Sequence, residues 1–323
     1  MFKRFLAFLS VGCLAFVATL SAADNWPAWR GPLANGISTE KGLPTKWSTT
    51  ENIAWKLPLP SRSGATPIVW GDHIFLNVAT AMSSGSLELW AVDRRKGEPI
   101  WKKPLGGGNV KLQKQNMSTP SPVTDGTTVW VMTGTGMLKA FDFKGAEIWS
   151  RDIQQEYGRF GLNHGYASSP LLHQGTLYIQ VLHGMNTDDP SYVMKVDGKS
   201  GKTLWKVNRP THAIQESPDS YTTPLLVGSG PSATIVVTGG DIVTAHDPGT
   251  GKELWRANGL NPTNDPWYRI VATSLRYIAS GSSSFSPSLN AVVGAVGEIS
   301  TSALANAASK SRWIRVRTFW AEP

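Results

Sequence analysis

One phrase recurs four times along this chain and constrains its fold more than any other feature. An aspartate ends an apolar run, a short polar turn with a glycine follows, and a tryptophan comes seven or eight residues after the aspartate. The copies are AVDRRKGEPIW (91–101), KAFDFKGAEIW (139–149), KVDGKSGKTLW (195–205) and AHDPGTGKELW (245–255). A spacing that is kept in four copies indicates a structural repeat.

Each residue type in the phrase has a physical role. An aspartate at the head of a turn accepts hydrogen bonds from backbone N–H groups two residues on. Glycine adopts the positive φ of a short hairpin loop at little cost. The tryptophan is then expected on the outermost strand of its unit, where its indole wedges against the next sheet and protects an exposed edge. The predicted joint residues are Asp93, Gly97, Trp101, Asp142, Gly145, Trp149, Asp197, Gly201, Trp205, Asp247, Gly251 and Trp255.

A second phrase keeps step with the first and divides each unit into four strands. It is a small polar residue, a proline and an apolar run, as in SSPLLHQGTLYI (168–179). For this unit we predict strands at 170–173, 176–182, 192–196 and 203–207, since short β-branched and apolar runs bounded by glycine and aspartate are strand signals. Four-stranded units at periods of 46 to 56 residues predict an all-β fold, a β-propeller of four-stranded antiparallel blades, with about four to five blades present.

The repeat resembles that of the pyrroloquinoline-quinone-like (PQQ-like) propellers, a family that includes quinoprotein dehydrogenases and BamB-like proteins of the bacterial envelope. The resemblance covers residues 25–275, and the opening NWPAWRGPLANGIS (25–38) is similar to the start of many exported bacterial members. Family members usually close a ring of roughly seven or eight blades, so the arc read here is incomplete. The resemblance implies an exported protein.

The two ends of the chain differ from the repeats. Residues 1–23 are expected to be a signal peptide, with Lys3 and Arg4 before an apolar run and a small-residue cleavage site at Ala23. The alternatives are a membrane anchor, or a lipidated Cys13. That residue is the chain's only cysteine, so cleavage leaves no thiol for chemistry.

Residues 276–323 lose the repeat within a unit, because the first-strand phrase IVATSL (270–275) is followed by no Asp–Gly–Trp phrase. We expect residues 24–275 to be the propeller repeats and 276–323 to be a disordered or frameshift-derived tail. The alternative is an arc completed by another chain.

Charge and motifs exclude several classes of function. The net charge is +8, but residues 24–275 hold 24 basic and 21 acidic residues, without the basic stripe that a nucleic-acid site needs. The six histidines form no dense metal motif, and neither a nucleophile elbow nor a phosphate loop is present.

The connections between blades are the best candidates for function, because polar and aromatic residues on loops held by a rigid scaffold commonly bind ligands. The predicted ligand or partner surface consists of Asn163, His164, Tyr166, His183, Asp188, Asp189, Glu216, Asp219, Tyr221, Asp265, Trp267, Tyr268 and Arg269. Solvated loops without a specific role are the alternative.

The resemblance allows two functions. One is a binding or scaffold module for an envelope protein or a small ligand, with no nucleic acid and no membrane span after signal cleavage. The other is a quinoprotein-type oxidoreductase dependent on PQQ and calcium, or another enzyme using the acidic loops. Calcium is coordinated by roughly six to eight oxygen ligands. The acidic residues of these loops match no family motif, so neither PQQ nor calcium is assigned.

Overall fold

The structure is a computed structural model that describes residues 25–267 apart from 111, 113 and 114. The expected signal peptide and tail, with Tyr268 and Arg269, lie outside the described residues. The described chain is almost entirely β, with one short helix, α1 (Ile153–Tyr157), and one 3₁₀ turn, η2 (Gly230–Ser232). No helix among these residues is long and apolar enough to cross a membrane.

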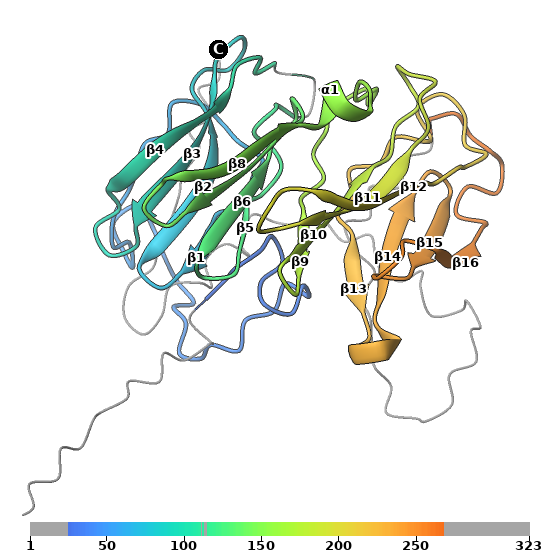
Figure 1. The fold of residues 1–323 in the computed structure, drawn as a ribbon. Helices are drawn as coiled ribbons and strands as arrows, with labels where there is room; N and C mark the ends of the chain where they lie inside the picture. Colours follow the sequence, from blue (N-terminus) through green and yellow to red (C-terminus); the bar gives the residue numbers. More distant parts are fainter. Residues whose placement is uncertain (1–24, 111, 113–114, 268–323) are drawn as a thin grey trace, which may run out of the picture.

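Sixteen strands form four antiparallel sheets of four strands each, so the predicted fold class is confirmed (Figure 1). Within every sheet the spatial order follows the sequence order. Blade 1 contains β1 (Ile68–Trp70), β2 (His73–Ala79), β3 (Leu87–Asp93) and β4 (Pro99–Gly106). Blade 2 contains β5 (Val123–Thr124), β6 (Thr128–Met132), β7 (Met137–Asp142) and β8 (Glu147–Asp152). Blade 3 contains β9 (Leu171–His173), β10 (Thr176–Val181), β11 (Tyr192–Asp197) and β12 (Thr203–Asn208). Blade 4 contains β13 (Leu225–Val227), β14 (Thr234–Gly239), β15 (Ile242–His246) and β16 (Glu253–Ala257).

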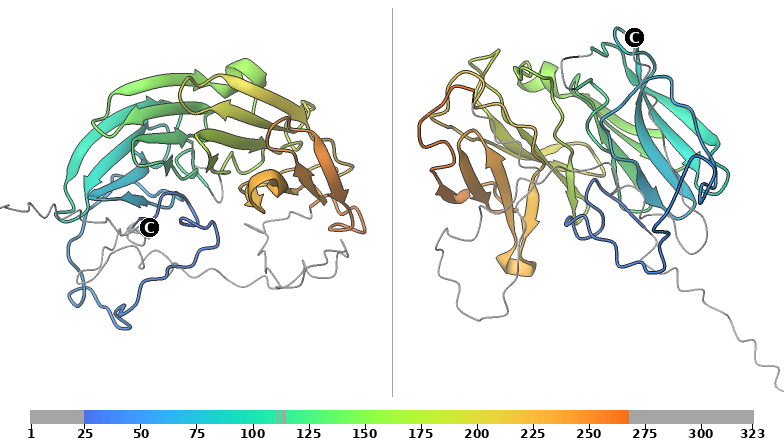
Figure 2. Two further views of the ribbon diagram at one scale, coloured as in Figure 1. Left: turned by 60° about the horizontal axis from the view of Figure 1, so that its bottom comes forward. Right: turned by 180° about the vertical axis from the view of Figure 1, so that it is seen from behind.

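The blades lie side by side in an arc, with their first strands next to one another on the concave side (Figure 2). The N-terminal segment runs along this inner side. Trp26 forms a bridge with Val69 of β1, and Thr124 of β5 donates its N–H to the carbonyl of Pro27 at 2.9 Å. The segment therefore holds the inner edges of the first two blades together.

A chain of hydroxyl groups links the inner ends of all four blades. The N–H of Thr66 donates to Ser121 Oγ at 2.9 Å, that of Ser121 to Ser169 Oγ at 3.0 Å, and that of Ser169 to Thr223 Oγ1 at 3.1 Å. These residues come from the small-polar-proline phrase that precedes each first strand. The phrase thus links each blade to the next by one hydrogen bond from a backbone N–H to a side-chain hydroxyl.

Aspartate, glycine and tryptophan make a joint at the outer side of each blade. Asp197 accepts the N–H of Ser200 at 2.6 Å, and Gly201 has a φ of 73°. The indole of Trp149 in blade 2 packs against Gly201 in blade 3, where a Cβ would lie 2.7 Å from its Cδ2. Trp149 Nε1 also donates to the carbonyl of Gly198, the residue after the aspartate, at 2.8 Å.

The same joint occurs at the other described interfaces. The indole N–H of the tryptophan always donates to the carbonyl of the residue that follows the aspartate in the next turn. The pairs are Trp55 with Arg94 (2.8 Å), Trp101 with Phe143 (2.9 Å) and Trp205 with Pro248 (3.2 Å). Trp55 precedes blade 1 and lies outside the four sheets, so the N-terminal segment supplies this first joint itself.

Candidate functional site

The loops that connect the blades are tied together by one buried carboxylate, that of Asp219. Its Oδ2 accepts the N–H of Asn163 at 2.7 Å, and its Oδ1 accepts the N–H groups of Gly184 and Met185 at 2.9 and 3.1 Å. These donors lie on the connection 158–170 and on the hairpin between β10 and β11, whereas Asp219 lies on the connection 210–224. Three loops of blades 2, 3 and 4 are therefore held as one unit.

Burial dominates the electrostatics of this carboxylate. The Asp219 side chain is fully buried, and desolvation raises its pKa to about 6, with a further rise from the nearby Glu216. The three backbone N–H donors oppose this rise because they stabilise the ionised form. Asp219 is consequently a carboxyl group whose protonation changes close to neutral pH.

A buried contact between a histidine and a glutamate lies beside Asp219. His164 Nε2 is 3.3 Å from Glu216 Oε1, and both side chains are almost inaccessible to solvent. The N–H of His164 donates to the hydroxyl of Tyr221 at 3.3 Å, and the two rings lie 6.1 Å apart. The pair thus joins the connection 158–170 to the connection 210–224 at a second point.

His183 fixes the base of the β10–β11 hairpin. Its Nδ1 accepts the N–H of Gly161 at 3.1 Å, so in the neutral ring the proton is on Nε2, which faces the carbonyl of Pro190 at 3.5 Å. Burial lowers the pKa of His183, which favours this neutral form. His183 therefore serves as a neutral bridge between two loops.

The last described loop packs against the same unit. The carbonyl of Pro266 accepts the N–H groups of Glu216 and Ser217 at 3.0 and 3.1 Å. Asp265 Oδ1 accepts the N–H of Trp267 at 2.8 Å, and the Trp267 side chain is 55% exposed. The loop places a large aromatic side chain on the surface beside the buried network.

The structure brings one part of the predicted surface together and distributes the rest. Asn163, His164, His183, Glu216, Asp219 and Tyr221 form the connected network, which we call the loop network. Asp188, Asp189, Asp265 and Trp267 are exposed around it. Tyr166 lies in the core between blades 2 and 3, where its hydroxyl donates to the carbonyl of Gln180 at 3.0 Å and burial raises its pKa.

One important residue near this face was missed in the sequence. Arg209 is 1% exposed and has no carboxylate partner among its hydrogen bonds, which go to Thr244 Oγ1 at 2.8 Å and to the carbonyls of Gly239, Ile242 and Val237 at 2.8, 2.9 and 3.3 Å. Burial lowers its pKa to about 9. In the sequence, only its position before Pro210, just after a Trp-containing strand, distinguishes Arg209. Because arginine is ordinarily found on the surface, that position alone does not predict burial.

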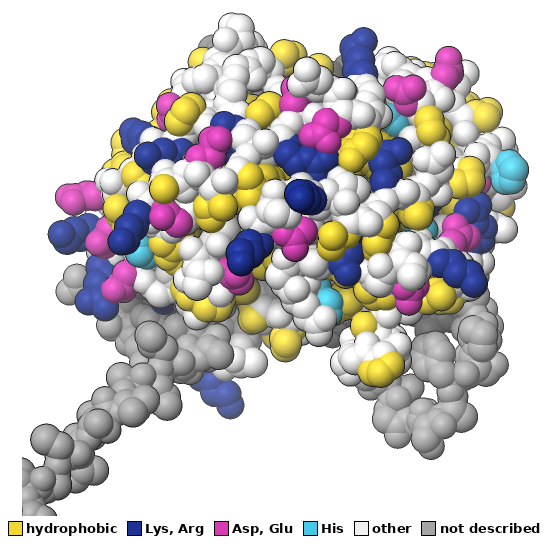
Figure 3. Space-filling view, viewed as in Figure 1, with side chains coloured by type: hydrophobic (Ala, Val, Ile, Leu, Met, Phe, Trp, Pro, Cys, Tyr) yellow, Lys and Arg dark blue, Asp and Glu magenta, His cyan; other side chains and the backbone are white. Residues whose placement is uncertain are grey.

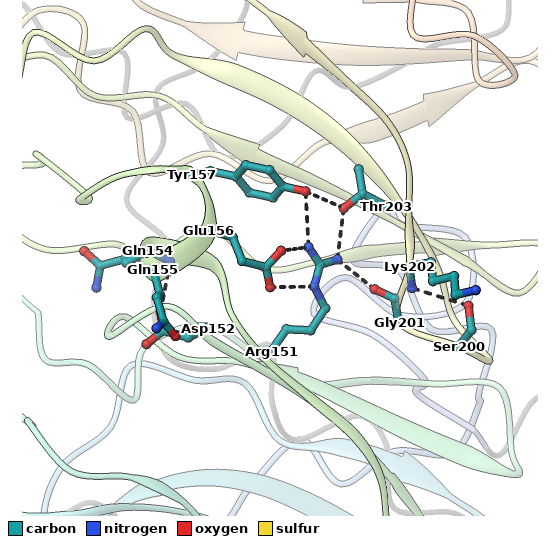
Figure 4. A network of polar contacts seen from close by, with 10 residues as sticks. All are labelled: Arg151, Asp152, Gln154, Gln155, Glu156, Tyr157, Ser200, Gly201, Lys202 and Thr203. Atoms are coloured by element: carbon teal, nitrogen blue, oxygen red, sulfur yellow. Dashed lines mark hydrogen bonds and ion pairs between the residues drawn. The ribbon is translucent and has the colours of Figure 1, made fainter.

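A second polar network lies at the rim between blades 2 and 3 (Figure 4). Its residues line a shallow hollow of about 470 Å³. Arg151 forms a forked ion pair with Glu156 of α1, and its Nη1 donates to the carbonyl of Gly201 at 2.7 Å and to Thr203 Oγ1 at 3.0 Å. Tyr157 also contacts the guanidinium and Thr203. These bonds occupy the donors of Arg151, so the network clamps α1 to blade 3 and leaves this cation little capacity for a ligand.

The described loops offer no cluster of metal-binding side chains. In residues 25–267, apart from the three omitted positions, no group of three or more His, Cys, Asp or Glu side chains is arranged to hold a metal ion. The carboxylates of the loop network are directed at backbone N–H groups and at His164. These residues do not fit the oxygen-rich calcium site that a quinone cofactor of this kind would require.

Comparison with known proteins identifies the repeat. The family model described as outer membrane protein assembly factor BamB matches residues 37–179 and 189–281, which is most of the chain. No curated protein matches the sequence.

Two solved dehydrogenase structures share the fold at low identity. Quinohemoprotein alcohol dehydrogenase from Comamonas testosteroni has a TM-score of 0.51 and 16% identity, covering 75% of this chain and 42% of that chain. A europium-containing methanol dehydrogenase has a TM-score of 0.50 and 14% identity, covering 76% of this chain and 50% of that chain. BamB from Moraxella catarrhalis has a TM-score of 0.35 and 19% identity, covering 63% of this chain and 66% of that chain. The chain thus spans half or less of the two dehydrogenases.

Proposed function

Since the chain belongs to the BamB family of PQQ-like repeat propellers, we propose that it is an exported binding or scaffold module of the bacterial cell envelope. The surface that binds is the one built by the loop network and the exposed residues around it. The partner is an envelope protein or a small ligand. We further propose that residues 1–23 direct export, that 24–275 make up the repeats and that 276–323 stand apart from them.

The observation that carries this proposal is the position of Asp219. One buried carboxylate joins three loops of three blades, and the His164–Glu216 pair joins two of them again. A surface that is rigid before binding loses little conformational entropy when a partner arrives. The polar side chains of the loop network hold the loops together. This role suits a surface on which the exposed residues recognise a partner, and it suits acid–base catalysis by the network less well.

The exposed residues supply suitable contacts. Asp188 and Asp189 are exposed on the β10–β11 hairpin, and Trp267 and Ile214 are 55% and 45% exposed on the neighbouring loops. Aromatic side chains are enriched at protein–protein interfaces, and polar side chains lie at the solvent-accessible rim of such interfaces. By contrast, the face that carries β8, β11 and β12 shows acidic and basic side chains interspersed (Figure 3). Such a mixed surface does not favour a nucleic-acid partner.

The proposal is tested with two matched triple variants. One is Asp188→Ala, Asp189→Ala, Trp267→Ala on the loop surface. The other is Asp72→Ala, Glu98→Ala, Ile100→Ala, which removes two carboxylates and one apolar side chain that are exposed on blade 1. Each protein is immobilised, exposed to envelope extract of the source cells, and its retained polypeptides are identified by mass spectrometry.

We expect a polypeptide that the unaltered chain and the blade 1 variant retain and the loop variant loses. Equal retention by all three proteins would refute the loop surface as the binding site. Stoichiometric, calcium-dependent binding of PQQ together with dye-linked oxidation of an alcohol would refute the scaffold role and establish the oxidoreductase alternative.

A further inference from the structure

One of the four repeats has a histidine where the other three have a buried apolar residue. The residue before the repeat aspartate is Val92 in blade 1, Phe141 in blade 2 and Val196 in blade 3, each at most 1% exposed. In blade 4 this residue is His246, which is also 1% exposed. A buried imidazole needs hydrogen-bond partners that the apolar side chains of the other repeats do not need.

His246 lies on the face of blade 4 that packs against blade 3. In the antiparallel pair of β14 and β15, His246 is opposite Ile235, and Thr244 is opposite Val237. Residues directly opposite each other share one face of a sheet. Since Ile235 and Val237 belong to the apolar cluster between blades 3 and 4, the two polar side chains of β15 lie in that interface as well.

Arg209 connects these polar side chains to blade 3. Its backbone N–H donates to the carbonyl of Ser191, the residue before β11, at 2.7 Å. Its guanidinium enters blade 4, where Nε donates to Thr244 Oγ1 at 2.8 Å. The connection 210–224 begins with the next residue, so Arg209 attaches the start of this connection to both blades.

The chemistry of the atoms fixes the direction of each hydrogen bond in this group. A carbonyl only accepts, so His246 Nδ1, which is 3.0 Å from the carbonyl of Gly251, carries a proton. A guanidinium only donates, so Thr244 Oγ1 accepts from Arg209 and donates its own hydrogen to His246 Nε2 at 3.0 Å. The neutral Nδ1–H tautomer of His246 therefore satisfies every bond of the row Arg209–Thr244–His246, which we call the polar row.

A second proton on His246 disrupts the polar row. Nε2–H then donates to Thr244 Oγ1, and the threonine hydrogen loses its acceptor, because Thr244 Oγ1 has no third polar partner in the described part of the chain. Two cations, Arg209 and the imidazolium, also share one hydroxyl in a site closed to solvent. Burial lowers the pKa of His246; the carbonyl of Gly251 opposes this effect, and Arg209 adds to it. The closed interface thus selects the neutral ring.

The surrounding charges offer a second proton on His246 no bonded anion. The charged and titratable side chains around the site are Arg209, Tyr178 and Lys195 from blade 3 and its connection, Asp241 and Asp247 from the turns of blade 4, and Glu253 and Arg256 from β16. The Glu253 carboxylate is paired with Arg256 at 2.7 Å. Among the described residues no carboxylate oxygen is hydrogen-bonded to the His246 ring, whose two nitrogens face Gly251 and Thr244.

We propose that the polar row is a pH-sensitive switch between blades 3 and 4, closed while the His246 imidazole is neutral and opened when it gains a proton. Below about pH 6.5, the ordinary pKa of histidine, the open form binds a proton that the closed form does not, so the closed form is lost progressively as pH falls. Opening frees the start of the connection 210–224 from blade 4. The proposal rests on contacts outside the loop network, so it and the proposed binding function can fail separately.

The first test measures the opening of this interface through one buried thiol. Val237→Cys places the reporter between blades 3 and 4, and Val131→Cys places a control reporter at the same strand position between blades 1 and 2. Both valines are fully buried, and both proteins carry Cys13→Ser so that the reporter is the only thiol. Each is labelled with dithiodipyridine between pH 7 and pH 5. The ratio of the two labelling rates removes the pH dependence of the thiol itself.

We expect labelling at position 237 to rise at least about tenfold relative to position 131 as pH falls from 7 to 5. His246→Gln removes the titrating ring and is expected to abolish this rise. His212→Gln, which removes an exposed histidine of the connection 210–224, is expected to keep it. An equal change at both reporters, or a rise that persists in His246→Gln, overturns the proposal.

The second test needs no change at His246 and therefore holds even where His246→Gln fails to fold. Long-range ¹H–¹⁵N spectra of the chain labelled at histidine distinguish the two neutral tautomers from the imidazolium. The His246 signal is assigned with Thr244→Ser, which keeps the hydroxyl of the polar row. We expect the Nδ1–H tautomer at pH 7 and a titration midpoint below about 6.5. An Nε2–H tautomer, or a midpoint at or above that value, overturns the proposal.

Discussion

The indole of Trp149 in blade 2 lies directly against the backbone of Gly201 in blade 3, so closely that a Cβ on Gly201 would be 2.7 Å from Cδ2 of the ring. Two conditions at Gly201 thus exclude a side chain: the approach of the indole and a φ of 73°. The glycine of the repeat is required by the neighbouring blade as much as by its own turn.

Gly201→Ala is expected to lower the free energy of unfolding by about 2–4 kcal/mol, since it adds steric overlap to the cost of a left-handed backbone. Gly175→Ala is the matched control, because Gly175 has a φ of 71° and its added Cβ would meet nothing within 4 Å. It is expected to cost only about 1 kcal/mol. Urea unfolding of both variants measures the difference, and equal costs would show that the contact with Trp149 is unimportant.

Ser169 tests the hydroxyl chain at the inner side of the arc. Its Oγ accepts the buried N–H of Ser121 at 3.0 Å. Ser169→Ala leaves that N–H without its acceptor and is expected to cost about 1–3 kcal/mol. Ser169→Thr keeps a hydroxyl and is expected to retain most of the stability. Chemical denaturation followed by tryptophan fluorescence distinguishes them, and a neutral Ser169→Ala would contradict a linking role.

Asp219 predicts a specific dependence of stability on pH. Burial raises its folded-state pKa to about 6, above the roughly 3.9 of an unfolded aspartate. Between about pH 4 and pH 6 the folded protein holds a proton that the unfolded chain releases, so the free energy of unfolding falls as pH rises through this window. The full penalty remains above pH 6.

This dependence is measured by urea unfolding of the unaltered protein and of Asp219→Asn between pH 4 and pH 7. The unaltered protein is expected to lose about 1–3 kcal/mol relative to the variant across the window. The amide of the variant accepts fewer N–H bonds, so it is also expected to be less stable at pH 4. Parallel pH profiles would show that Asp219 keeps its ordinary pKa.

Arg209 predicts a large effect at a position outside the repeat phrase. Arg209→Met removes the guanidinium N–H groups that donate to Thr244 Oγ1 and to the carbonyls of Gly239 and Ile242. These acceptors then lack their partner in a buried environment. We expect a loss of about 2–4 kcal/mol in the free energy of unfolding. Arg256→Met, which removes an exposed partner of Glu253, is expected to cost below about 1 kcal/mol. Similar losses at both positions in thermal or urea unfolding would contradict the structural role of Arg209.

Sequence reasoning located the strands closely because their signals are local. In the third unit the predicted strands at 170–173, 176–182, 192–196 and 203–207 correspond to β9, β10, β11 and β12, with ends that differ by one residue or none. Period-two alternation and turn residues act within about ten residues of chain, so a linear sequence contains them in full. The same strand pattern in all four copies of the repeat also supported the strand prediction for each of them.

The candidate site was predictable only in part. The sequence indicated which loops carry polar residues, but it could not show that Asp219 binds N–H groups of two other loops or that Tyr166 turns into the core. The partners of Asp219 are Asn163, Gly184 and Met185, between 34 and 56 residues away. Their distances depend on how adjacent blades pack.

The sequence by itself determined the repeat unit, its four strands and the residue types of the joint between blades, because these depend on backbone torsion, hydrogen bonding within a turn and alternation along a strand. Only the tertiary structure decided which carbonyl each indole reaches, which carboxylate is buried and where an arginine is enclosed. Those outcomes depend on the angle and distance between sheets, set by packing of many side chains at once. Asp219 is the clearest case, since its three N–H donors lie on two other loops, between 34 and 56 residues away in the sequence.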